Sequence, residues 1–61
     1  MSDVEKIINA LKDEYSYNQD IGYESLKEGD EDRMTWYYGK AAGVKKCIET
    51  IEKMKNYGII L

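Results

Sequence analysis

The chain has 61 residues, one cysteine and no histidine, and its formal net charge at pH 7 is −3. A chain of this length forms one domain at most, and such chains usually gain stability from disulfides, metal ions or oligomerisation. Cys47 alone cannot form an intramolecular disulfide, and without histidine it cannot complete a zinc site of the usual kind. We therefore expect a homo-oligomer without cofactor or metal.

The charge pattern and the first residues exclude several functional classes. Acidic and basic residues are mixed along the chain, whereas nucleic-acid-binding domains usually carry a basic stripe. The charged N-terminal segment resembles neither a signal peptide nor a transit peptide, and the longest aliphatic run is too short to span a membrane. We expect a cytoplasmic protein that binds neither membranes nor nucleic acid.

The first predicted element is a helix over residues 3–28. Ser2 and Glu5 have the spacing of a capping box, in which each satisfies a free backbone N–H at the helix start. An apolar stripe then follows at helical spacing and consists of Val4, Ile7, Ile8, Leu11 and Tyr15. Helix propensity falls between residues 18 and 22, which makes this stretch a candidate position for a break or kink.

Gly29 and Asp30 mark the boundary to a second predicted helix, over residues 31–57. Glycine suits the left-handed conformation after a helix, and aspartate is a favoured N-cap. Gly58 is expected to end the second helix, with Ile59 packed against Met54. The sequence thus predicts an all-α fold, in which residues 1–61 form a single antiparallel helical hairpin with helices about 40 Å long.

The position of the turn sets the expected register between the helices. In a hairpin that turns at residues 29–30, facing residues have numbers that add to about 59. The expected pairs are Leu11 with Ile48, Ile8 with Ile51, Tyr15 with Val44, Gly22 with Tyr37, and Leu26 with Met34 or Arg33.

The second helix carries two stripes, of which a hairpin can cover only one. The stripe expected to face the first helix contains Met34, Tyr37, Ala41, Val44, Ile48 and Ile51. The other stripe contains Trp36, Lys40, Gly43, Cys47, Thr50 and Met54, with Gly39 and Tyr57 at its edge. The residues expected to form an oligomer interface are Trp36, Gly39, Gly43, Cys47, Thr50 and Met54. Its glycines would let a second helix approach closely, so we predict a homodimer that forms a four-helix bundle. Alternatively, the glycines accommodate nearby tyrosines in a monomer, or expose helix backbone to a ligand.

Patterns that carry catalysis are missing, so we predict a protein without enzymatic activity. Without histidine, a general base would have to come from a carboxylate, an amine, a phenol or Cys47, and Cys47 is expected to be a small buried hydrophobic residue. The acidic run at residues 30–32 lacks the ligand spacing of an EF-hand. The Gly39-Lys40 pair lacks the earlier glycine of a P-loop.

The aromatic residues indicate a binding surface. There are six tyrosines, one tryptophan and no phenylalanine, and tyrosine and tryptophan are enriched at interfaces. Tyr15 and Tyr37 are expected in the hairpin core. The predicted partner-binding residues are Tyr17, Tyr23, Arg33, Tyr38 and Lys40. The alternative is that these tyrosines are half-exposed and merely cover a thin core.

One segment supports a family resemblance. Residues Gly29–Met54 combine an acidic Gly-Asp helix start, the run YYGKAAG and an amphipathic tail rich in Ile, Glu and Lys. This combination resembles small accessory proteins of tailed bacteriophages that act early in infection. The resemblance implies a protein that docks on a host protein in the host cytoplasm and modulates or inhibits it. Some such proteins sequester nucleotide signals, so an oligomeric nucleotide trap is the alternative. No catalytic residue is carried over.

Overall fold

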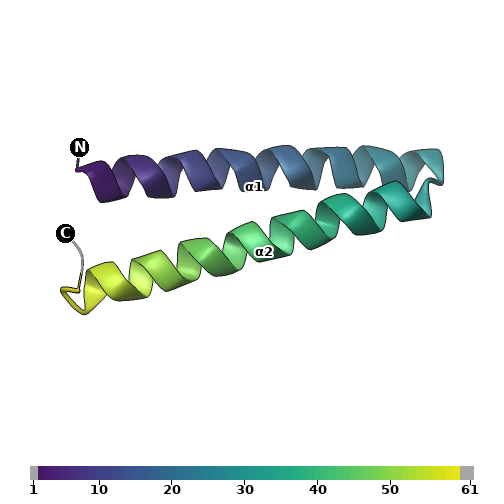
Figure 1. The fold of residues 1–61 in the computed structure, drawn as a ribbon. Helices are drawn as coiled ribbons and strands as arrows, with labels where there is room; N and C mark the ends of the chain where they lie inside the picture. Colours follow the sequence, from purple (N-terminus) through teal and green to yellow (C-terminus); the bar gives the residue numbers. More distant parts are fainter. Residues whose placement is uncertain (1, 60–61) are drawn as a thin grey trace.

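The computed structural model describes residues 2–59 and contains two helices, α1 (Asp3–Glu28) and α2 (Glu31–Asn56). The helices run antiparallel, side by side, and a short turn at residues 29–30 joins them (Figure 1). The described residues contain no strand. This architecture confirms the predicted all-α hairpin, and α2 ends one residue before the predicted position.

The turn is fixed by the two residues that the sequence singles out. Gly29 adopts the left-handed conformation with φ 77°, which a side chain would disfavour. Asp30 caps α2, because its Oδ1 accepts a hydrogen bond from the backbone N–H of Arg33 at 3.1 Å. At the start of α1, Ser2 Oγ accepts from the backbone N–H of Glu5 at 3.1 Å, as the capping box predicts.

The end of α2 follows the same pattern. Gly58 is left-handed with φ 75°, and the backbone N–H of Ile59 donates to the carbonyl of Met54 at 2.9 Å. These features make the predicted Schellman motif in the backbone. The side chain of Ile59, however, is exposed.

Helix α1 is continuous, so the break considered near residues 18–22 does not occur. Tertiary packing explains the difference, because Asn18 and Gly22 are both buried against α2. The Nδ2 of Asn18 also donates to the carbonyl of Glu14 at 2.9 Å, within the helix. Burial of a helix face contributes more to helix stability than intrinsic propensity does.

The interface between the helices changes character along its length. Near the termini the buried residues are Ile8 and Ile48, whereas nearer the turn they are Gly22, Ser25 and Ala41. Small side chains allow closer backbone approach, and the two ribbons converge toward the turn and spread toward the termini (Figure 1). Two residues expected in the interface, Ile7 and Leu26, are instead exposed.

The register near the turn differs from the expected one by one residue. The ring of Tyr38, not that of Tyr37, lies over Gly22: a Cβ built on this glycine would be 2.6 Å from Tyr38 Cδ1. A tyrosine therefore does lie opposite Gly22 as predicted, but it is Tyr38 and not Tyr37. Nearer the termini, Ile8 and Ile48 are buried and Leu11 and Ile51 are half-buried, as the predicted stripes require.

The hairpin is long and thin. Its principal extents are 44 × 18 × 10 Å and its radius of gyration is 13.9 Å, against about 10.5 Å for a compact domain of this length. Among the described hydrophobic residues, only Ile8, Ala41 and Ile48 are buried. A large share of the apolar surface therefore stays available for contacts with other molecules.

Candidate binding surfaces

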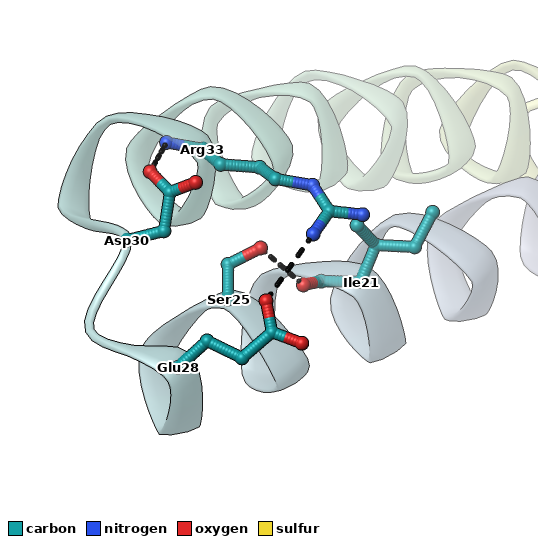
Figure 2. A network of polar contacts seen from close by, with 5 residues as sticks. All are labelled: Ile21, Ser25, Glu28, Asp30 and Arg33. Atoms are coloured by element: carbon teal, nitrogen blue, oxygen red, sulfur yellow. Dashed lines mark hydrogen bonds and ion pairs between the residues drawn. The ribbon is translucent and has the colours of Figure 1, made fainter.

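Two ion pairs between the helices mark the two long edges of the hairpin. On one edge Arg33 Nη1 lies 3.6 Å from Glu28 Oε2, and the two side chains point toward each other between the helices (Figure 2). On the other edge Lys12 Nζ lies 3.9 Å from Glu52 Oε1. Glu28 and Lys12 are about 160° apart around α1 at 3.6 residues per turn. We call these sides the Arg33 edge and the Lys12 edge.

The exposed tyrosines of α1 lie on different edges. Tyr17 precedes Glu28 by eleven residues, and Tyr23 follows Lys12 by eleven, a spacing that brings residues within about 20° of each other on a helix. Tyr17, 59% exposed, is thus on the Arg33 edge, whereas Tyr23, 56% exposed, is on the Lys12 edge. They cannot form the single surface that the sequence suggested.

Tyr38 is the clearest correction among the predicted partner-binding residues. Its ring lies against Gly22 of α1 and its side chain is half-buried. It therefore belongs to the contact between the helices. The sequence contained a signal for this role, because a glycine in α1 needs a large residue opposite it, but Tyr37 and Tyr38 fit that requirement equally well.

The other predicted basic residues gather on the Arg33 edge with two aromatic rings. Lys40 Nζ lies 5.5 Å from the ring centroid of Tyr37 and 5.9 Å from that of Trp36. The guanidinium of Arg33 lies 5.9 Å from the ring centroid of Tyr37. These distances are within the range of cation–π attraction. The sequence-based prediction included Arg33 and Lys40 in the binding surface, but assigned Tyr37 to the core.

The stripe predicted as an oligomer interface is open to solvent. Trp36 is 64% exposed, and Gly39, Gly43, Cys47 and Thr50 are exposed as well. Met54 is half-buried. We call this stripe the glycine face. Cys47 is therefore not the buried hydrophobic residue that we expected.

The glycines of this face do not make room for a side chain of the same chain. A Cβ built on Gly39 or Gly43 would have no neighbouring atom within 4 Å. This excludes the interpretation that they accommodate tyrosines in a monomer. Next to Gly43, the face is hollowed into a groove of about 310 Å³ that is also lined by Lys46, Cys47, Thr50 and Ile51.

A second hollow, which the sequence did not indicate, lies where the helices spread near the termini. It encloses about 270 Å³, and its lining residues are Glu5, Ile8, Asn9, Lys12, Glu52, Lys55 and Asn56. Two ion pairs connect its walls, Lys12 with Glu52 and Lys55 with Glu5, the latter at 3.6 Å. The charges balance within the hollow, so it offers no preference for an anion or a cation.

Two general properties of residues 2–59 complete the description. No group of three or more His, Cys, Asp or Glu side chains in this range is arranged to hold a metal ion. Neither helix has a sufficiently long apolar stretch to cross a membrane.

Comparisons of the chain with protein-family models, with curated proteins and with solved structures found no match.

Proposed function

We propose that this protein is a non-enzymatic binding module that docks on another protein through the Arg33 edge. The docking residues are Tyr17, Arg33, Tyr37 and Lys40. Following the resemblance to phage accessory proteins, we propose that the chain is phage-encoded and that the partner is a host protein, which it modulates or inhibits.

The observation that carries this proposal is the cation–aromatic cluster on an exposed edge. Lys40 lies near two aromatic rings and forms no ion pair with a carboxylate among the described residues. Its charge remains available to a partner. Arginine and tyrosine are enriched at interfaces, where their large side chains can each contribute about 2 kcal/mol or more.

The nucleotide trap is the second candidate, and the same cluster favours it. An ammonium group beside the half-buried Tyr37 ring and the exposed Trp36 ring could bind a phosphate while a base stacks on Trp36. The protein partner is preferred because small ligands usually bind in concave sites. The two hollows described above are lined by other residues.

A pull-down comparison tests the proposal. Three proteins are immobilised and exposed to host lysate: wild type, the double variant Tyr17→Ala/Lys40→Ala and the control Tyr23→Ala. We expect one or more host proteins to be enriched by wild type and by Tyr23→Ala, and to be depleted at least tenfold with the double variant. Equal enrichment by all three proteins would contradict the assignment of the Arg33 edge.

Isothermal titration calorimetry distinguishes the nucleotide trap from protein docking. ATP, cyclic AMP and a cyclic dinucleotide serve as the probes. We expect no binding at micromolar concentration. Micromolar binding that disappears in Lys40→Ala would support the nucleotide trap and overturn the preferred proposal.

A further inference from the structure

The groove on the glycine face has the shape of a coiled-coil hole. Four of its five lining residues, Gly43, Lys46, Cys47 and Thr50, have the spacing i, i+3, i+4 and i+7, the four positions that surround an inserted side chain in helix packing. The hydroxyl of Thr50 donates to the backbone carbonyl of Lys46 at 3.0 Å, so it needs no partner in the groove. The groove therefore suits an apolar side chain.

We propose that this groove is filled by Trp36 of a second copy of the chain, in an antiparallel α2–α2 contact around a two-fold axis. Trp36 is 64% exposed and precedes Gly43 by seven residues, so it lies on the same face as the groove. A parallel pair would place Trp36 against Trp36 and groove against groove. An antiparallel pair seats each tryptophan in the groove of the other copy.

The register between the two α2 helices in this dimer gives independent support to the proposal. If Trp36 faces Lys46 of the second copy, facing residues have numbers that add to about 82. The same register places Gly39 opposite Gly43 of the second copy, at both symmetry-related positions. These are the two glycines whose Cβ positions are open. Both glycines then lie where the backbones come closest, which accounts for their cost in helix propensity.

Surface area and charge agree with a second copy as the occupant. The hairpin exposes 4642 Å², whereas a typical folded monomer of its mass exposes about 4,100 Å². The excess, roughly 500 Å², approaches the 800 Å² or so that each partner buries in a standard interface. An antiparallel contact also brings the acidic first turn of α2, Glu31 and Asp32, near Lys53 of the other copy.

This contact leaves Tyr17 and Arg33 uncovered, but it borders the host-protein docking surface proposed above, because Trp36 also contacts Lys40 of the Arg33 edge. Light scattering after size exclusion tests it at tens of micromolar protein. Wild type should be a dimer, whereas Trp36→Ala and Gly43→Leu should raise the dimer dissociation constant by roughly tenfold or more. The controls Tyr23→Ala and Glu49→Leu, away from the contact, should stay dimeric. Circular dichroism should show that all variants remain helical.

Cysteine cross-linking tests the register directly. In the proposed dimer the two Cys47 residues are about 18 Å apart along the axis, at 1.5 Å per residue, too far for a disulfide. Lys40 lies one residue from the two-fold centre at residue 41, so Lys40→Cys in a Cys47→Ser background places two thiols about 3 Å apart along the axis and should oxidise to a covalent dimer, while wild type does not. The proposal would be overturned by any of three results. These are a monomeric wild type, a dimer that Trp36→Ala and Gly43→Leu do not affect, and efficient Cys47–Cys47 cross-linking in wild type.

Discussion

At the residue scale, three glycines inside the helices have different surroundings. Gly22 is covered by the Tyr38 ring, whereas Gly39 and Gly43 face open space in the single chain. In α1 the glycine is required by the contact with α2. In α2 the two glycines lower the stability of the helix, and no contact within the chain requires them.

Alanine substitutions separate these roles. Gly22→Ala should lower the free energy of unfolding, because the new Cβ would be 2.6 Å from two carbons of the Tyr38 ring. The gain in helix propensity, about 1 kcal/mol, does not offset such an overlap. Gly39→Ala is the matched control, measured by urea denaturation at concentrations where the chain is monomeric. It should raise the stability of the hairpin by about 1 kcal/mol. Similar effects from both substitutions would count against the Tyr38–Gly22 contact.

At the element scale, the helix boundaries could be predicted and the exact pairing could not. The helix ends are set by local backbone geometry, so the residues that fix them can be recognised in the sequence: Ser2, Gly29, Asp30 and Gly58. The choice between Tyr37 and Tyr38 depends on a rotation of α2 by one residue, which the hydrophobic pattern does not fix. The continuity of α1 likewise depends on the burial of Asn18 and Gly22 by the other helix. Poor local propensity gave no indication of that burial.

Asn18 gives a prediction about the pairing of the two helices. Its side chain is fully buried, and its Oδ1 has no hydrogen-bond partner among the described residues. A buried unpaired polar group costs about 1–3 kcal/mol. Asn18→Ala removes this oxygen and also the Nδ2 hydrogen bond to the Glu14 carbonyl, which keeps its partner in the helix. After this loss and a small loss of packing, the free energy of unfolding should increase by roughly 1 kcal/mol in urea denaturation.

Two comparisons make the Asn18 prediction specific. Ser25→Ala removes a hydroxyl that already donates to the Ile21 carbonyl at 2.8 Å (Figure 2), so its effect should be smaller. Asn18→Asp should lose stability as the pH rises above about 4, because burial raises the pKa of a carboxyl group and its ionisation opposes folding. A clear loss of stability in Asn18→Ala at neutral pH would show that Asn18 contributes to the pairing of the helices.

At the scale of the whole molecule, the hairpin presents two adjoining surfaces. The Arg33 edge carries the cation–aromatic cluster, the glycine face carries the groove, and the two meet at the contact between Lys40 and exposed Trp36. The sequence indicated both sets of residues in part, since the glycines and tyrosines are unusual for a chain this short. It could not separate Tyr17 from Tyr23, because the edge to which a residue belongs depends on how α1 is rotated toward α2.

Site-specific photo-cross-linking in the native host tests the central claim, that these surfaces have different partners. A benzophenone amino acid replaces Tyr17, Tyr23 or Trp36, one at a time, and the adducts are identified by mass spectrometry. We predict a host-protein adduct from position 17, an adduct with a second copy of this chain from position 36, and no specific adduct from position 23. The same host protein captured equally from positions 17 and 23, or no self-adduct from position 36, would contradict the account.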